Sequence, residues 1–282
     1  MSVPLKLVDW IPESKLDWGR LSINPNAIQL LKQFHNHHIN WKFLSANEND
    51  KAVDLLLENV ERIDWEYLSE NPNDRAVELL KEHPQHIDWS YLSKNQNDKA
   101  IKILEQNPEK INWCWLSGNK NAMNLISQNP DKIDWDYLSM NSSEDAIYLL
   151  ERFPEKINWG AMAFNKNDNA IKILEKNIDK INWSFLSDNP NEKAIRLLEK
   201  NQDKITWDRL SRNPNGLSLL KQNQELINWY WLSGNPSIFE YDYLSMAKER
   251  NAILLQELME VTWHPKRMVD WCLEYNDTYF EI

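Results

Sequence analysis

Apolar residues recur along the chain in a helical pattern. Between residues 71 and 83, Ala76, Val77, Leu79 and Leu80 are spaced to share one face of an α-helix, which predicts an amphipathic helix. The Asn-Pro-Asn triplet at 71–73 is typical of a helix start, because asparagine caps free N–H groups and proline suits the first turn. Prolines are expected to end these helices, since they cannot continue the N–H ladder, at Pro84, Pro108, Pro130 and Pro154.

A shorter helix is predicted before each of these. Trp65 and Leu68 stand at positions i and i+3, which places them on the same helical face. The residue before each tryptophan has a short polar side chain suited to an N-cap: Asp64, Asp88, Asn112, Asp134, Asn158 and Asn182. The pattern therefore predicts a unit of two helices.

This unit recurs at a nearly fixed period. Ten tryptophans stand 22–24 residues apart: Trp18, Trp41, Trp65, Trp89, Trp113, Trp135, Trp159, Trp183, Trp207 and Trp229. Self-similarity at such a period indicates a repeat array. We predict that these ten tryptophans are the structural core, because a fully buried tryptophan hides roughly 150–250 Å² of surface.

A two-helix unit of this length cannot bury its own apolar face, so neighbouring units are expected to stack. The sequence predicts an all-α fold, an α-solenoid of about ten stacked two-helix repeats of 22–24 residues. Residues 1–17 are expected to form an N-terminal cap, 18–235 the array and 236–282 a C-terminal helical cap, in one continuous domain. At about 8–10 Å per layer, the array would be a rod or arc on the order of 80–100 Å long.

Composition excludes several classes of function. The chain carries 32 Lys+Arg and 43 Asp+Glu, and its formal charge of −11 disfavours binding to nucleic acid. Two cysteines cannot supply a disulfide framework or a cysteine-rich zinc site, and five glycines argue against a phosphate-binding loop. No apolar run approaches the roughly 18 residues of a membrane helix, and residues 1–6 lack the apolar region of a signal peptide.

Reactive side chains recur with the repeat and form no singular cluster. Acidic residues return at helix starts, where the helix dipole favours them, and serines return at the register that ends the short helix. The segment 35–38 holds three histidines without a neighbouring acid or cysteine, and Cys114 and Cys272 have no visible partner base. The sequence therefore predicts no enzyme, no catalytic residue, no metal site and no cofactor.

A column of bases stands three residues before the tryptophans: Lys15, His38, Arg62, His86, Lys110, Lys132, Lys156, Lys180 and Lys204. Stacking would align these bases into a ribbon that could follow phosphates. An acidic residue directly precedes most of them, at Glu61, Glu109, Asp131, Glu155, Asp179 and Asp203. The two columns largely cancel, so nucleic acid is not the expected partner.

A column of aromatic residues provides the best candidates for binding. These residues stand two positions after the tryptophans: Phe43, Tyr67, Tyr91, Trp115, Tyr137, Phe185 and Trp231. The column is interrupted by Ala161 and Arg209. Because this position points to a different side of the helix from the tryptophan, both cannot share one core stripe. Either the column packs between adjacent short helices, or it lines an exposed protein-binding face.

These motifs resemble a tandem-repeat family found in giant DNA viruses of protists and algae. Its units read much like Asn-Pro-Asn-Ala-Ile-x-Leu-Leu followed by Ile-Asn/Asp-Trp-x-x-Leu-Ser, and the resemblance covers nearly the whole chain. The opening segment 8–12 and the closing segments 235–243 and 257–267, including His264-Pro265-Lys266-Arg267, are also similar. The resemblance implies a viral origin and no settled activity. Unit 159–164 departs from the pattern, with Ala163 where serine is expected, and is either locally distorted or the site of a bend.

Repetition without a catalytic cluster favours a non-catalytic protein–protein interaction solenoid, a scaffold or adaptor, whose partner is a viral or host protein. The alternative is a structural strut of a giant-virus particle, in its capsid or internal layer. An enzyme would require an apolar pocket with convergent polar groups. The chain is expected in the host cytoplasm or the virion, neither secreted nor membrane-spanning.

Overall fold

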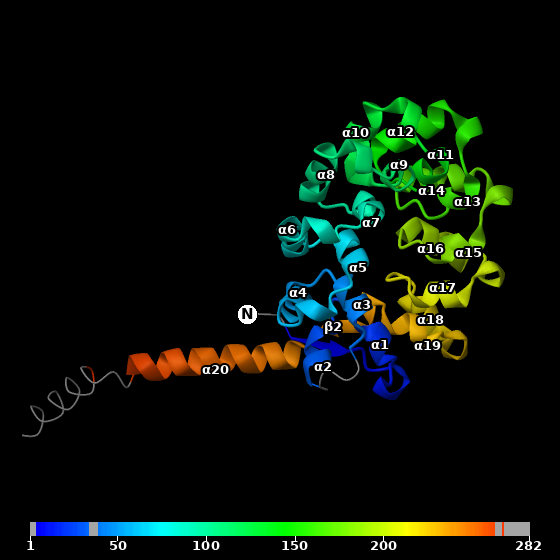
Figure 1. Cartoon of the computed structure of the whole chain (residues 1–282). Coiled ribbons are helices and arrows are strands. Elements are labelled where there is room, and N and C mark those ends of the chain that lie inside the picture. The colour runs from blue at the N-terminus through cyan, green and yellow to red at the C-terminus, as the bar shows by residue number, and fades with distance from the viewer. Residues whose placement is uncertain (1–3, 34–38, 263–266, 268–282) are drawn as a thin grey trace, which may run out of the picture. The chain divides into compact units, whose positions relative to one another are not determined.

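The computed structural model describes residues 4–33, 39–262 and 267. Within these residues the regular structure is helical apart from one two-stranded sheet, which confirms the predicted all-α solenoid (Figure 1). The chain forms two units, Asp9–Ile238 with all the tryptophan repeats, and Met1–Val8 together with Phe239–Ile282. The expected division at 17 and 235 within one domain therefore differs from the units in the structure.

Each repeat is numbered by its tryptophan, from repeat 1 at Trp18 to repeat 10 at Trp229, and begins with a short α-helix. The short helices are α1 (Trp18–Leu21), α3 (Trp41–Ser45), α5 (Trp65–Glu70), α7 (Trp89–Lys94), α9 (Trp113–Ser117), α11 (Trp135–Leu138), α13 (Trp159–Met162), α15 (Trp183–Ser187), α17 (Trp207–Ser211) and α19 (Trp229–Ser233). A second α-helix follows in repeats 1–9: α2 (Ile28–Gln33), α4 (Asp50–Leu57), α6 (Asp74–Glu82), α8 (Asp98–Glu105), α10 (Met123–Ser127), α12 (Glu144–Arg152), α14 (Asp168–Glu175), α16 (Glu192–Glu199) and α18 (Leu217–Gln222).

A 3-10 turn that the sequence analysis did not predict then leads into the next repeat. These turns are η3 (Val60–Arg62), η4 (Pro84–His86), η5 (Pro108–Lys110), η7 (Pro130–Lys132), η8 (Pro154–Lys156), η9 (Ile178–Lys180), η10 (Gln202–Lys204) and η11 (Gln224–Leu226). The prolines expected to end the long helices are the first residues of such turns, where their missing N–H has no partner to lose. In repeat 5, η6 (Lys120–Ala122) also precedes α10.

The helix starts follow from the capping residues that the sequence predicts. Asp64 caps α5, and its Oδ1 accepts from the backbone N–H of Tyr67 at 3.1 Å. The cap of α6 is Asn73, whose Oδ1 accepts from the backbone N–H of Arg75. Asn71 lies outside this helix, and its Oδ1 accepts from the backbone N–H of Asn73.

The residue three positions after each tryptophan, a leucine in nine repeats and Met162 in repeat 7, forms the innermost column of the core. Its members have no exposed surface: Leu21, Leu44, Leu68, Leu92, Leu116, Leu138, Met162, Leu186, Leu210 and Leu232. The alanines that open most long helices, such as Ala76 and Ala100, are equally buried. Their small side chains let the two helices of a repeat approach closely.

Buried asparagines join the repeats through a ladder of hydrogen bonds. The side-chain amide of each one donates to two backbone carbonyls of the preceding repeat, one at the serine register and one at the previous asparagine, over 2.7–3.2 Å. The ladder consists of Asn24, Asn47, Asn71, Asn95, Asn119, Asn141, Asn165, Asn189, Asn213 and Asn235. Each satisfies carbonyls that the short helices leave without an intrahelical partner.

The recurring serine forms a second link between repeats. The Ser69 hydroxyl donates to the carbonyl of Trp65 at 2.7 Å and accepts from the backbone N–H of Asp88, in the next repeat, at 3.0 Å. In repeat 7 Ala163 lacks this hydroxyl, yet α13 is followed by α14 at the usual place, and Asn189 still bonds the Ala163 carbonyl at 2.9 Å. The departure at 159–164 therefore removes the two hydrogen bonds that the serine hydroxyl makes in other repeats and leaves the order of helices intact.

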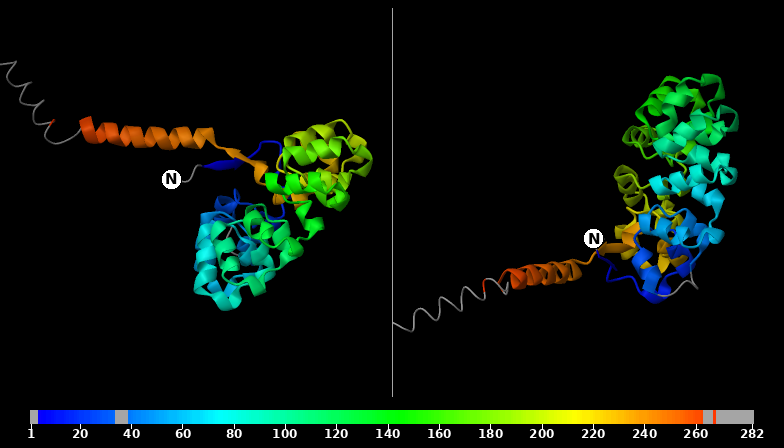
Figure 2. Two further views of the ribbon diagram at one scale, coloured as in Figure 1. Left: turned by 90° about the horizontal axis from the view of Figure 1, so that it is seen from above. Right: turned by 60° about the vertical axis from the view of Figure 1, so that its left-hand side comes forward.

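The array closes on itself, because repeat 1 packs on repeat 10 as each repeat packs on its predecessor. Asn24 donates to the carbonyls of Ser233 at 3.1 Å and Asn235 at 2.8 Å, and the backbone N–H of Asp17 donates to the Ser233 hydroxyl at 2.8 Å. Helix α1 accordingly lies beside α19 (Figure 1), and Figure 2 shows the closed array from two further directions. The expectation of an open rod or arc with two capped ends is wrong for residues 9–238, which form a ring.

The tenth repeat is assembled from both ends of this ring-forming segment. After α19 the chain makes the turn η12 (Pro236–Ile238) and then leaves the array. Residues before Trp18 supply the end of the same repeat, because η1 (Glu13–Lys15) stands at the register of the 3-10 turns. Ile11 and Leu16 are 5% and 6% exposed, and Leu16 occupies the place of Ile63 or Ile111 in other repeats. Part of the expected N-terminal cap is therefore a piece of the tenth repeat.

The other unit contains the sheet and one long helix. Strand β1 (Leu5–Leu7) pairs antiparallel with β2 (Phe239–Tyr241), with Leu7 opposite Phe239. Lys6 Nζ lies 3.1 Å from Glu240 Oε1 across this pair. Helix α20 (Tyr243–Thr262) follows, and Asp242 accepts at its start from the backbone N–H of Ser245. The expected helix opened by Pro265, with Val269, Cys272 and Leu273, lies outside the described residues.

An exposed ion pair between repeats 7 and 8 makes stability depend on pH. Lys193 Nζ lies 2.6 Å from Asp168 Oδ2, and hydrogen bonds from Lys193 and Asn191 lower the pKa of Asp168 below its usual 3.8. A carboxylate with a lowered folded-state pKa adds stability above its unfolded pKa, and this is lost as the pH falls through the folded value. The stability difference between wild type and Lys193→Met is therefore expected to shrink below about pH 3.8 in urea titrations at several pH values.

The matched control is Lys102→Met, which removes the same charge from an exposed position of α8. A difference for Lys193→Met that stayed constant down to pH 2.5 would contradict the assignment of this pH dependence to Asp168.

Candidate binding surface inside the ring

The ladder tryptophans are half-buried and do not belong to the fully buried core, which corrects the prediction made from the sequence. The bases of the sequence column cover their rings. Arg62 lies over Trp41 at 5.0 Å and Lys132 over Trp113 at 4.5 Å, and His86 stacks on Trp65 at 4.6 Å. Similar pairs are Lys110 on Trp89, Lys180 on Trp159, Lys204 on Trp183 and, across the ring closure, Lys15 on Trp229. The basic column thus serves as the cover of the indoles through cation–π contacts.

The aromatic column two residues after the tryptophans runs between adjacent short helices, and all seven predicted residues are half-buried. Ring centroids of Tyr67 and Tyr91 lie 5.8 Å apart, and those of Trp115 and Tyr137 lie 4.9 Å apart. Phe185 stacks on Phe164 at 4.4 Å. These contacts agree with the alternative in which the column packs between adjacent short helices. Each ring also keeps an exposed part that a ligand could contact.

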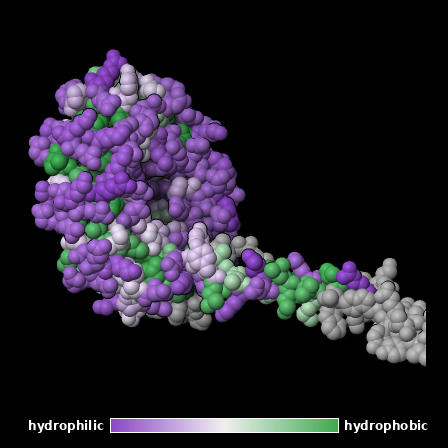
Figure 3. All heavy atoms as spheres, turned by 180° about the vertical axis from the view of Figure 1, so that it is seen from behind, coloured by the Kyte–Doolittle hydropathy of each residue, from purple (hydrophilic) through white to green (hydrophobic). Residues whose placement is uncertain are grey.

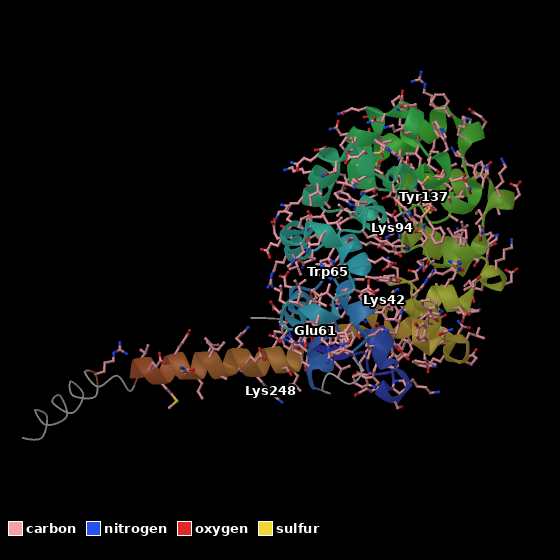
Figure 4. The ribbon with its side chains drawn as sticks, viewed as in Figure 1. Lys42, Glu61, Trp65, Lys94, Tyr137 and Lys248 are labelled. Carbon is pink, nitrogen blue, oxygen red and sulfur yellow. The ribbon has the colours of Figure 1, made fainter. Side chains whose placement is uncertain are left out.

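Cations alternate with these aromatic rings. Lys94 Nζ lies 4.1 Å from the ring centroid of Tyr91 and 3.7 Å from that of Trp115, and Lys42 Nζ lies 4.5 Å from Tyr67. Figure 4 labels Lys42, Lys94 and Tyr137, which come from every second short helix, α3, α7 and α11. A hydrogen bond to Glu66 raises the pKa of the Tyr91 hydroxyl, so this phenol stays neutral. The column is a row of contacting aromatic rings and cations and not a plain apolar stripe.

The loops that end the short helices converge inside the ring. Two adjoining cavities of about 430 and 460 Å³ share Gln96 as a lining residue. The first is lined by Ile23, Ala46, Tyr67, Glu70, Pro72, Lys94 and Gln96. The second is lined by Gln96, Gly118, Lys120, Met140, Ser142, Phe164, Lys166, Asp188, Pro190 and Pro214. Repeats 4 and 9 stand opposite each other in a ring of ten and line the same cavity, and Figure 3 shows a hollow there surrounded mainly by hydrophilic residues.

All residues that line the two cavities stand at one of three registers, the second, fifth or seventh residue after a tryptophan, and these registers over the ten repeats define the inner surface. They carry six basic residues, Arg20, Lys94, Lys120, Lys166, Arg209 and Arg212, and three acidic residues, Glu48, Glu70 and Asp188. The inner surface is therefore net positive, although the whole chain has a formal charge of −11. Such a reversal of sign favours a ligand that carries negative charge.

Arg20 occupies the same register as the aromatic column but is not among the binding residues predicted from the sequence. Its guanidinium lies 4.8 Å from the ring of Phe43 and 4.6 Å from that of Trp231. Burial lowers the pKa of Arg20. The signal was present in the sequence, because Arg209 interrupts the column in the same way, but only ring closure brings Trp231 beside Arg20.

Cys114 is exposed, and its hydrogen bond to Asp134 raises the pKa of the thiol, which opposes thiolate formation. Among the described residues no cluster of three metal-ligating side chains occurs, and the histidines at 35, 37 and 38 lie outside them. None of the described helices combines the length and hydrophobicity required to cross a membrane.

Comparison of the chain with protein-family models, curated proteins and solved structures gave no match. The viral repeat family therefore remains a prediction that rests on the sequence motifs alone.

Proposed function

We propose that this chain is a non-catalytic interaction scaffold or adaptor whose ring binds a segment of another protein in its central opening. If the chain is viral, as its resemblance implies, the partner is a viral or host protein. The observation that carries the proposal is the pair of adjoining cavities inside the ring, which share Gln96 and are lined by residues from nine repeats.

The distribution of variable residues supports this proposal. The leucine, asparagine and serine registers hold nearly the same residue in every repeat, because they join one repeat to the next. The fifth register after the tryptophan instead holds apolar, acidic, basic and glycine residues in turn. A surface that varies on an invariant frame suits recognition of one particular partner.

Substitution of Gln96 tests the proposal, because this exposed side chain lines both cavities. Gln96→Trp is expected to place an indole where the two cavities adjoin and to reduce recovery of the partner at least tenfold. The measurement is affinity purification of the whole chain from infected cells, with quantitative mass spectrometry of the proteins that bind to it.

The matched control is Gln106→Trp, which adds the same bulk at the exposed C-cap of α8 in the same repeat. The proposal is supported if proteins recovered with wild type and Gln106→Trp are lost with Gln96→Trp. Recovery of the same proteins in the same amounts with both variants would rule out a binding function for the central cavities.

A further inference from the structure

Arg20 stands out among the charged residues of the inner surface because aromatic rings surround its guanidinium, whereas the Asp17 carboxylate acts on its charge only weakly and forms no ion pair with it in the described part of the chain. Phe43 and Trp231 lie within 5 Å of its guanidinium carbon, and Tyr230 lies at 5.6 Å. Stacked rings hold the planar guanidinium in one orientation, so little side-chain entropy is lost when its N–H groups bind an acceptor.

The Nε of Arg20 is buried and finds no hydrogen-bond acceptor in the described part of the chain. A buried donor without a partner costs stability, so it indicates a group that a ligand would satisfy. The neighbouring arginines differ, because Arg212 makes two bonds to Asp188, at 2.7 and 2.5 Å, and Arg209 lies 3.9 Å from the same carboxylate.

The surroundings leave room for this side chain next to the first cavity. A Cβ on Gly234 would lie 3.0 Å from Arg20 Nε and 3.2 Å from Ile23 Cγ2, so glycine at this position permits the arginine. Ile23 lines the first cavity. A group bound to Arg20 would therefore lie at the margin of the opening and could extend into it.

The chemistry of this surface favours carboxylates over a nucleic acid. Six basic against three acidic residues match a few spaced negative charges, whereas a nucleic acid would bring one charge per nucleotide to a chain of formal charge −11. The inner aromatic rings contact one another in tilted, edge-to-face and stacked pairs with centroids 4.4–5.8 Å apart, and several also carry a cation, so their faces are partly covered against a stacking base.

We propose that Arg20 is a carboxylate-binding site and that the segment held in the ring is an acidic stretch of a partner protein. This inference rests on the proposed binding function and adds the chemistry of the ligand. The planar edge of a guanidinium matches a carboxylate in two parallel hydrogen bonds, which a lysine ammonium cannot reproduce.

Fluorescence anisotropy with a fluorescein-labelled hexaglutamate peptide tests this assignment on the full chain. Arg20→Gln is expected to weaken binding about tenfold to a hundredfold, and Arg20→Lys to restore little of it. Arg196→Gln removes the same charge from an exposed position of α16 and is expected to leave the dissociation constant unchanged. Equal losses in Arg20→Gln and Arg196→Gln, or no saturable binding to wild type, would overturn the proposal.

A measurement on the wild-type chain covers the case in which Arg20→Gln fails to fold. The Nε–H resonance of Arg20, identified by its absence from Arg20→Lys, is expected to shift when the unlabelled peptide is added. A larger shift at lower concentration with inorganic phosphate or single-stranded oligothymidylate would overturn the carboxylate assignment. If Gln96→Trp does not reduce partner recovery, the proposed binding function is contradicted. If only the Arg20 resonance fails to shift, the carboxylate-binding assignment is contradicted and the proposed function is not.

Discussion

Replacement of Asn24 by alanine is expected to lower the free energy of unfolding by about 2–5 kcal/mol, as much as Asn95→Ala in the middle of the array. Each substitution leaves two buried carbonyls without their donor: those of Ser233 and Asn235 for Asn24, and those of Ser69 and Asn71 for Asn95. The measurement is urea unfolding followed by tryptophan fluorescence for both variants and wild type.

Equality of the two effects is the test of ring closure. In an open array Asn24 would stand in a terminal repeat with no predecessor, and its loss would cost little. Asn124→Ala, on an exposed position of α10, is the control and is expected to change stability by less than about 0.5 kcal/mol. A cost for Asn24→Ala near that of Asn124→Ala, beside a large cost for Asn95→Ala, would show that the ring is open.

Leu92→Ala is the second substitution with a large expected effect, a loss of about 2–5 kcal/mol. The Leu92 side chain has no exposed surface, and its loss would leave a cavity between α7 and the neighbouring helices. Urea unfolding of the full chain measures the effect.

The matched control is Leu57→Ala at the end of α4, where the side chain is 43% exposed. Its cost is expected to stay below about 1 kcal/mol, because little apolar surface returns to water. Equal costs at the two positions would mean that the leucine register is not the innermost layer of the core.

Local structure could be predicted from the sequence because its causes lie within a few residues. Asp64 before Trp65 caps a helix through a bond to the residue three positions later, and that spacing is visible in the chain. The stripe from Ala76 to Leu80 is buried as its period requires. The prediction that the tryptophans are fully buried is wrong, because it rests on their size alone. The bases that cover their exposed faces come from 19–21 residues later in the same repeat, so local sequence does not reveal this cover.

Ring closure could not be predicted because it depends on the sum of small rotations between repeats. One signal was nevertheless present, since Lys15 stands at the same register before Trp18 as Lys110 does before Trp113. This register indicates that residues 11–16 are the end of a repeat, and the structure shows that the same repeat begins at α19. The candidate site shows the same limit, because Arg20 and Trp231 are 211 positions apart and meet only across the closure.

The closed ladder has a consequence for how the length of this chain can change. An open solenoid can gain or lose a unit by gene duplication or deletion, because a terminal repeat adds only one interface. Here ten interfaces together complete one turn, about 36° each, and a ring of nine would require every remaining interface to absorb about 4° more. Copy number is therefore under structural selection, and descendants of this chain can diversify the residues facing the opening far more easily than the count of their repeats.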